Sequence, residues 1–331
     1  MSQEKILEAA YREGERLGKI KSVPVFTSLL VPPTFSDTEV EYDIFEPRTF
    51  EEYIGQDHAK DLAQIMIQAA AKEVRPIPNI LITGSYGLGK TTLAKLILQG
   101  KSFEETTGTA ANNRERFAGY LLLDEIHNLR PDVCDNLNPQ IDGGKLRIIG
   151  CTPNPGLLPG PFRSRFRIVN LTPYTVEDLT QIQYNAINRK GTITAPYALL
   201  EEISKRSRST PRRALQYLAF VMDLMAVKDE GVLTKNTLDE AFDKLGVDNL
   251  GLLAIDHQYL AALPADRAVG LQYLTAVLQV DKDTLEQEIE PYLMHMKLID
   301  RTARGRFKIA TLEEQLEASL DEIFREKNHG S

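Results

Sequence analysis

The sequence predicts an α/β protein in which a parallel-sheet domain is followed by a helical domain and a C-terminal winged helix. Short apolar runs alternate with helical stretches from about residue 48 to residue 171. The pattern is then only helical from Thr175 to Leu245, and a last helical set ends in a short hairpin with a glycine turn at Gly305. Nearly continuous apolar strands separated by helices are typical of a parallel sheet covered on both faces.

Composition places the 331-residue chain among ordinary globular proteins, with 42% hydrophobic and 26% charged residues. No apolar run approaches the roughly 18–20 residues that cross a bilayer, and the charged N-terminus is no secretory signal, so we expect a cytoplasmic protein without a membrane partner. The only cysteines, Cys134 and Cys151, form neither a zinc spacing nor a disulfide framework. At a net charge of −8, binding of nucleic acid would require a local basic patch.

Changes in pattern along the chain predict its domain boundaries. The predicted segments are residues 1–45 (N-terminal helix and linker), 46–173 (sheet domain), 174–247 (helical domain), 248–310 (winged helix) and 311–331 (C-terminal helix and tail). Within the sheet domain, the predicted strands are the apolar runs 80–82, 120–123, 146–150 and 167–171. In the helical domain, Thr210 can act as an N-cap with Pro211 at the first helical position.

A phosphate-binding loop follows the first predicted strand and precedes a predicted helix. The loop is Gly84-Ser85-Tyr86-Gly87-Leu88-Gly89-Lys90-Thr91. Its glycines let backbone N–H groups turn onto phosphates, and the positive end of the helix points to the same place. Lys90 would reach the β- and γ-phosphates, and Thr91 would offer its hydroxyl to Mg²⁺. Strand, loop and helix in this order favour an ATP site over a glycine-rich surface turn.

Two acidic residues, Asp124 and Glu125, end the second predicted strand. Asp124 would hold Mg²⁺ at the carboxyl edge of the sheet, and Glu125 would activate the attacking water. Two acids in this position can also be a solvated strand end, but downstream of a phosphate loop they predict ATP hydrolysis. His127 is as consistent with the start of a helix as with chemistry, so we assign it no role.

Several separate stretches, in the same order, resemble the AAA+ ATPases and, within them, the RuvB family of Holliday-junction branch-migration motors. The matching stretches are 49–56, 87–94, 124–127, 156–158, 161–166, 209–212, 245–252, 290–293 and 301–306. The resemblance therefore covers most of the chain between Arg48 and Arg306. It implies an AAA+ P-loop domain, a helical lid domain and a C-terminal winged helix, with ATP and Mg²⁺ as cofactors.

The resemblance also implies which residues surround the nucleotide. Tyr53 and Ile54 would line the adenine pocket, with Tyr174 packed near the base. Thr92 continues the matched phosphate loop. The first sensor would be Thr152 or Asn154, either of which could bind the γ-phosphate or the attacking water.

Two arginine positions have implied roles in completing the site. Arg165, or else Arg163, would be an arginine finger that reaches the ATP of a neighbouring subunit, and this implies a homo-oligomer, expected to be a hexameric ring. An ordinary basic loop is the alternative for both. Arg212, after Pro211 in the second sensor, would contact the γ-phosphate from the lid.

A basic cluster lies on the predicted wing. Arg301, Arg304, Arg306 and Lys308 fall within eight residues, and Gly305 permits the tight turn. We expect these residues to contact the phosphates of double-stranded or branched DNA without sequence preference. A solvated basic hairpin is the alternative interpretation.

The chain departs from the RuvB pattern in three places. Ser85 and Tyr86 replace a Pro-Pro pair in the phosphate loop. Residues 100–119 are polar, so an expected strand is predicted to be missing or very short. Residues 128–145 are too few for a helix and also the long hairpin with which RuvB engages RuvA. The sequence therefore gives no support to a RuvA-type partner, and residues 1–45 could supply a different contact.

Three functional hypotheses follow. The first is an ATP-driven ring motor that translocates on duplex DNA and moves Holliday junctions in recombination and repair, as the resemblance implies. The second is an ATP switch that acts as a helicase loader, clamp loader or matchmaker, which the missing hairpin favours. The third is a non-catalytic scaffold that binds DNA and holds a nucleotide for structure, against which Glu125 and the arginine finger argue.

Overall fold

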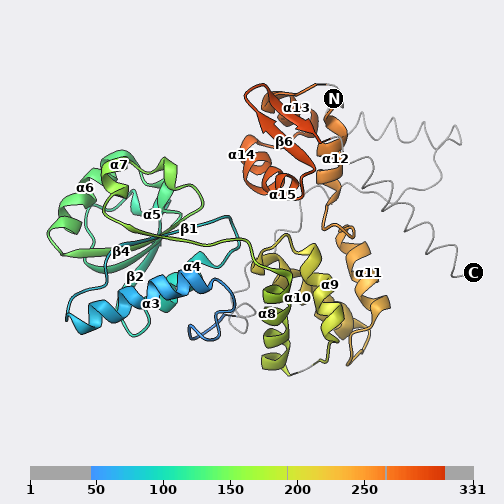
Figure 1. Cartoon of the computed structure of the whole chain (residues 1–331), viewed down its shortest axis with the longest axis horizontal. Coiled ribbons are helices and arrows are strands. Elements are labelled where there is room, and N and C mark those ends of the chain that lie inside the picture. Colours follow the sequence, from blue (N-terminus) through green and yellow to red (C-terminus); the bar gives the residue numbers. More distant parts are fainter. Residues whose placement is uncertain (1–45, 192, 265–266, 310–331) are drawn as a thin grey trace, which may run out of the picture. The chain divides into compact units, whose positions relative to one another are not determined.

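The computed structural model describes residues 46–191, 193–264 and 267–309 (Figure 1). The predicted N-terminal helix and linker and the predicted C-terminal helix lie outside these residues. Among the residues described, no helix is both long and apolar enough to span a membrane.

The first domain is built on a five-stranded parallel sheet with the order β2-β3-β4-β1-β5 (Figure 1). Its strands are β1 (Ile80–Thr83), β2 (Phe103–Thr107), β3 (Gly119–Asp124), β4 (Leu146–Thr152) and β5 (Arg167–Asn170). The helical segments of this domain are α3 (Asp57–Lys72), α4 (Lys90–Ile97), α5 (Gly108–Ala111), η1 (Ile126–Asn128), α6 (Pro131–Asp142), η2 (Pro155–Leu157) and α7 (Gly160–Arg163).

Both faces of the sheet are covered, as the apolar strands predict. All four residues of β1 are buried, and its three apolar residues alternate between two cores. Ile80 and Ile82 pack with α3 and α4, whereas Leu81 packs with α6 and α7. Since successive strand side chains point to opposite faces, an uninterrupted apolar run is what a strand between two helical layers needs.

The structure corrects the prediction for residues 100–119. They contain a five-residue strand, β2, which pairs in parallel with β3 from Phe103 opposite Tyr120 to Thr107 opposite Asp124. This strand lies at the edge of the sheet and its residues alternate between exposed and half-buried. The polar sequence Phe-Glu-Glu-Thr-Thr therefore lacks the apolar run by which the other strands were recognised.

The segment between β3 and β4 is short, as the sequence predicts. After the η1 turn, α6 ends at Asp142, and Gly143, Gly144 and Lys145 lead directly into β4. Residues 128–145 are all described, and they contain no strand and hence no hairpin.

The second domain is helical. It consists of α8 (Val176–Lys190), α9 (Tyr197–Arg206), α10 (Pro211–Val227) and α11 (Lys235–Leu245), which share one apolar core. Helix α10 begins at Pro211 with Thr210 at the N-cap position, as predicted. The Thr210 hydroxyl, however, donates to the carbonyl oxygen of Ser207 instead of capping the helix.

The third domain is a winged helix with its own core. Its elements are α12 (Ala254–Ala262), α13 (Leu271–Leu278), α14 (Lys282–Thr284), the π-helical turn η3 (Leu285–Ile289), α15 (Glu290–His295), β6 (Ile299–Thr302) and β7 (Gly305–Lys308). Strands β6 and β7 form the antiparallel wing. Val269 exchanges two backbone hydrogen bonds of 2.9 Å with Arg306, which ties the wing to the segment before α13.

The wing depends on glycine at position 305. Gly305 has φ +133°, and a Cβ atom there would lie 2.2 Å from the carbonyl oxygen of Val269. We expect Gly305→Ala to lower the free energy of unfolding by about 2 kcal/mol or more. The added Cβ would clash with the Val269 backbone, which cannot move aside as a flexible side chain can. Denaturant unfolding of the full chain measures this.

Gly270→Ala is the matched control for that variant. Gly270 has φ −74°, and a Cβ atom added there would have no other atom within 4 Å, so the change in stability should stay within about 0.5 kcal/mol. Equal unfolding midpoints for the two variants would contradict the proposed role of the Gly305 backbone.

Candidate functional site

The phosphate loop runs from the end of β1 to the start of α4. Gly84 has φ +142°, and a Cβ atom there would lie 2.8 Å from the carbonyl oxygen of Leu171. The loop therefore passes so close to the backbone after β5 that only glycine fits. Helix α4 then begins at Lys90, so its free backbone N–H groups face the loop.

Lys90 is held inside this loop. The residue is 8% exposed, and its Nζ donates to the carbonyl oxygens of Gly84 and Ser85 at 2.8 Å each. Burial lowers the pKa of Lys90, because removal from water disfavours the charged form. An ammonium in this position is placed to exchange two carbonyl contacts for phosphate oxygens.

The loop and the acidic strand end meet through one hydrogen bond. The Thr91 hydroxyl donates to Asp124 Oδ2 at 2.8 Å. A hydroxyl oxygen beside a carboxylate suits Mg²⁺, which takes few protein ligands and completes its shell with phosphate and water. The residues present therefore fit the ion that the sequence implied.

Glu125 follows in a left-handed conformation with φ 46°. Its Oε2 accepts a 3.2 Å hydrogen bond from Nδ2 of Asn128. The one-turn helix η1 brings Asn128 back to Glu125, a contact that the sequence motifs did not predict. The only sequence feature that could have indicated this contact is that Asn128 follows Glu125 by three residues, which is about one helical turn.

His127 lies in the same turn. Its Nδ1 is buried and has no hydrogen-bond partner among the described residues. Burial lowers the pKa of the His127 imidazole, which favours the neutral ring.

The two candidates for the first sensor lie at the end of β4. Thr152 is fully buried, and its hydroxyl accepts a 3.0 Å hydrogen bond from the backbone N–H of Asn154. Thr152 stands opposite Thr83 of β1, next to the start of the phosphate loop. Both candidates are therefore beside the loop, and Asn154 is the more exposed of the two.

The residues expected around the adenine pack against the loop from the other side. Tyr53 is buried, and its hydroxyl donates to the carbonyl oxygen of Gly89 at 3.2 Å. Tyr174 is also buried, and burial raises the pKa of both phenols. Ile54 is half-buried beside Tyr53.

Arg212, the residue expected to act as the second sensor, contacts the phosphate loop directly. The backbone N–H of Arg212 donates to the carbonyl oxygen of Gly87 at 3.4 Å. A Cβ atom at Gly87 would lie 3.2 Å from the Arg212 Cβ. The first turn of α10, which starts at Pro211, therefore lies against the loop that would bind the phosphates.

The two candidate finger arginines are engaged locally. Arg165 forms a two-point ion pair with Asp142, at 2.9 Å from Nε to Oδ1 and 2.7 Å from Nη2 to Oδ2. This hydrogen bonding lowers the pKa of Asp142 and raises the pKa of Arg165. Arg163 donates to the carbonyl oxygen of Pro155 at 3.2 Å. Asp142, at the end of α6, is a partner that the sequence analysis did not identify.

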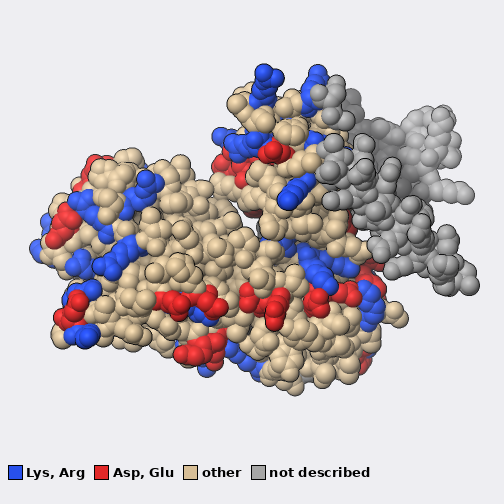
Figure 2. Space-filling view, viewed as in Figure 1, with Lys and Arg blue, Asp and Glu red and all other residues tan. Residues whose placement is uncertain are grey.

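The four basic residues of the wing separate into different environments. Arg306 is 6% exposed and is bound by Glu290 and Glu286, so its side chain is not available at the surface. Arg301 and Arg304 are exposed, and Lys308 is half-buried. On the face drawn in Figure 2, Lys and Arg atoms reach the surface of the winged helix with acidic atoms among them.

These features define a class of protein. A phosphate loop on a parallel sheet, an acidic pair at the next strand end and a lid helix that touches the loop are the parts of a P-loop ATPase of the AAA+ class. Three family models match consecutive parts of the chain. They are the Holliday junction DNA helicase RuvB P-loop domain (residues 45–149), the RuvB AAA lid domain (174–248) and the RuvB C-terminal winged helix domain (249–312).

Individual relatives agree with the family models. The chain is 36% identical over 303 residues to the Holliday junction branch migration complex subunit RuvB of Campylobacter fetus subsp. fetus, covering 81% of this chain and 88% of the relative. It is 34% identical over 327 residues to the RuvB subunit of Campylobacter jejuni strain RM1221, covering 88% and 97%. The solved structure of the Thermotoga maritima RuvB Holliday junction branch migration motor matches with a TM-score of 0.76 at 31% identity, covering 83% and 98%. The chain belongs to the RuvB family.

The burial of Arg306 leads to a stability prediction. Glu290 is fully buried, so Arg306→Met would leave its carboxylate without the cation that contacts it at 2.8 Å. We expect a loss of about 3 kcal/mol in the free energy of unfolding. Arg304→Met removes the same charge from an exposed position and should change stability by less than about 0.5 kcal/mol. Chemical denaturation of both variants checks this, and similar losses would show that Arg306 has no special structural role.

Proposed function

We propose that this protein is an ATP-driven motor that translocates on duplex DNA and moves Holliday junctions. The observation that carries the proposal is the joined site of Lys90, Thr91, Asp124 and Glu125 in a chain of the RuvB family. The relatives named above supply the substrate class, since they are branch-migration subunits. We further propose that the working domains are residues 46–173, 174–247 and 248–310.

The residues of the site support a division of labour in hydrolysis. Lys90 and the loop N–H groups would bind the β- and γ-phosphates. Mg²⁺ would be held by Thr91 and Asp124, where it would neutralise phosphate charge. Glu125 would accept a proton from the attacking water, and Thr152 or Asn154 would orient that water.

The hydrogen bond from Asn128 supports a restraint on Glu125. An amide that donates to Oε2 restricts the direction in which the carboxylate points. Asn128 would therefore position the base, so that its orientation depends on the η1 turn.

The lid and a neighbouring subunit would complete the site. Arg212 lies against the phosphate loop and would sense the γ-phosphate. Arg165 is the better candidate finger, because its planar guanidinium already binds a carboxylate at two points, as it would bind phosphate. A finger that acts on a neighbour requires an oligomer, and we propose that this oligomer is a homohexameric ring.

We propose that DNA contacts the accessible cations of the wing. These cations are the exposed Arg301 and Arg304 and the half-buried Lys308. Arg306 is buried in its ion pair with Glu290 and would stabilise the wing instead of contacting DNA. Such contacts would be independent of base sequence and weakened by salt.

A second candidate function is a loader or matchmaker that hydrolyses ATP slowly and assembles other proteins on DNA. The observation that favours it is the direct passage from α6 through residues 143–145 to β4, which leaves no hairpin for a RuvA-type partner. A RuvA-type partner is therefore not part of our proposal.

Two variants test the chemistry of the site. Lys90→Ala should abolish detectable binding of ATP, because it removes the cation inside the loop. Glu125→Gln should bind ATP normally and hydrolyse it about 100-fold or more slowly, because an amide cannot accept the proton. Fluorescent-nucleotide titration and phosphate release measure the two steps. Undiminished DNA-dependent function in both variants would support a scaffold that holds nucleotide only for structure.

A junction assay separates the motor from the loader. We expect the protein with ATP to move a four-way junction with homologous arms, and the Glu125→Gln variant to bind the junction without moving it. Gel analysis of labelled arms measures the products. A wild-type protein that binds the junction, hydrolyses ATP and moves nothing until a second protein is added would favour the loader.

A further inference from the structure

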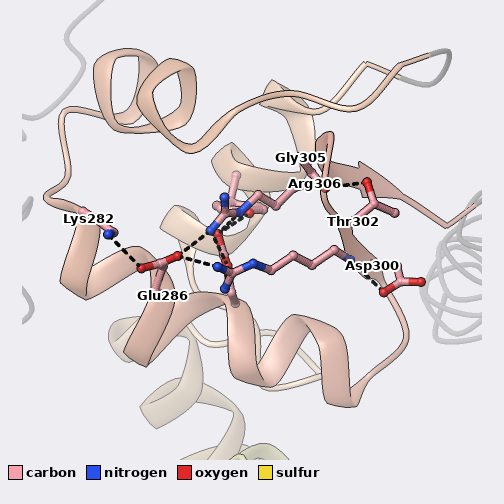
Figure 3. A network of polar contacts seen from close by, with 9 residues as sticks. Lys282, Glu286, Asp300, Thr302, Gly305 and Arg306 are labelled. Carbon is pink, nitrogen blue, oxygen red and sulfur yellow. Dashed lines mark hydrogen bonds and ion pairs between the residues drawn. The ribbon is translucent and has the colours of Figure 1, made fainter. Parts of the chain in front are cut away.

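A cluster of charges lies behind the wing, in the winged helix (Figure 3). Glu286 contacts three cations, at 2.8 Å from Arg306, 3.0 Å from Arg301 and 3.6 Å from Lys282. Glu290 accepts hydrogen bonds from Arg306 Nε at 2.8 Å and from the Tyr259 hydroxyl at 2.9 Å. The charges of the wing are therefore coupled to those of the helix beneath it.

The π-helical turn η3 places both carboxylates on one side. Glu286 lies inside this turn and Glu290 begins α15 directly after it. Residues four apart on a helix are neighbours, so the two carboxylates face the same arginines. Single π turns in helices are frequent at functional sites.

The two arginines of the cluster differ in how firmly they are held. The Arg306 side chain is 8% exposed, its guanidinium contacts both glutamates, and its backbone is bonded to Val269. The Arg301 side chain is 50% exposed, and its second contact, to Glu290, is 3.9 Å long. Arg306 is therefore fixed, whereas Arg301 can turn outward.

Breaking the ion pair between Arg301 and Glu286 has a low free-energy cost, because the other charges of the cluster balance without Arg301. Glu286 and Glu290 carry two negative charges, and Arg306 with Lys282 supplies two positive ones. Arg301 is the surplus cation, so the remaining cluster stays neutral when it leaves. Burial of an unpaired charge, the usual cost of breaking such a network, does not arise.

A hollow at the turn of the wing could hold a group that replaces Glu286 as the partner of Arg301. Residues 301–306 and Gly270 line this hollow, which has a volume of about 640 Å³. Arg304 lines it as well, and within the described residues its side chain forms no ion pair. Two guanidinium groups at one hollow suit a phosphate group, which arginine binds at two points.

We propose that Glu286 is an internal competitor for a DNA phosphate. In the free protein Glu286 holds Arg301, and a phosphate in the wing hollow takes Arg301 from it. Glu286 therefore limits the affinity of the wing for DNA, because its ion pair with Arg301 must break before the phosphate binds. This inference rests on the proposed DNA contact of the wing.

Glu286→Gln in the full chain tests the competition. The variant keeps the shape of the side chain and removes its charge. We expect about threefold or tighter binding of a labelled duplex, because an amide competes weakly for a guanidinium. The slope of log affinity against log salt should stay close to that of the wild type, because Arg301 contacts the same phosphate in both complexes. Fluorescence anisotropy over a salt series measures both.

Glu288→Gln is the matched control. Glu288 lies in the same turn, is exposed, and forms no ion pair among the described residues, so the net charge changes equally without loss of a contact to Arg301. Its affinity and slope should stay close to those of the wild type. Equal gains in both variants would reduce the effect to overall charge and overturn the proposal.

Arg301→Gln provides the second test. Combined with Glu286→Gln, it should cancel the gain, because the cation that Glu286 restrains is gone. A gain that persists without Arg301 would overturn the proposal. If Glu286→Gln lowers the unfolding midpoint, Arg301→Gln alone must still reduce the salt slope by about 0.9. Failure of the wild type and every variant to bind duplex DNA would instead overturn the proposed DNA contact itself.

Discussion

The hydrogen bond between the Thr91 hydroxyl and the Asp124 carboxylate joins the two halves of the nucleotide site, and the rest of the sheet domain serves to place it. Because β1, β3 and β4 are parallel, their carboxyl ends meet at one edge. The pairing of Thr83 with Thr152 brings the phosphate loop beside the end of β4. The β1–β4 and β3–β4 pairings therefore bring together Lys90, the Thr91 and Asp124 oxygens proposed to hold Mg²⁺, and the proposed sensor Thr152.

Cations in this protein have two different environments with two different consequences. Lys90 is buried against carbonyl oxygens, which a phosphate can replace, so its burial prepares it for a ligand. Arg306 is buried against two carboxylates that satisfy it, so it stabilises the wing. Arg301 lies between these cases, because its partner Glu286 is already neutralised by other cations.

The short connection between α6 and β4 also determines which partner Arg165 meets. The passage from α6 to β4 through three residues leaves Asp142 at the helix end, where it meets Arg165. The arginine proposed to act on a neighbouring subunit is thus held within its own subunit by a carboxylate. Formation of a ring would exchange this carboxylate for a phosphate of the same sign of charge.

The sequence by itself determined the buried strands, the phosphate loop and the acidic pair, since each depends on local pattern: continuous apolar runs, glycine spacing and a strand end. Only the tertiary structure showed β2, because an edge strand is not buried on both faces and so needs no apolar run. It alone distinguished Arg306 from Arg304, since charge spacing on a hairpin does not show which side chain meets Glu290. The pairing of Asp142 with Arg165 likewise joins residues whose proximity depends on how α6 and α7 pack on the sheet.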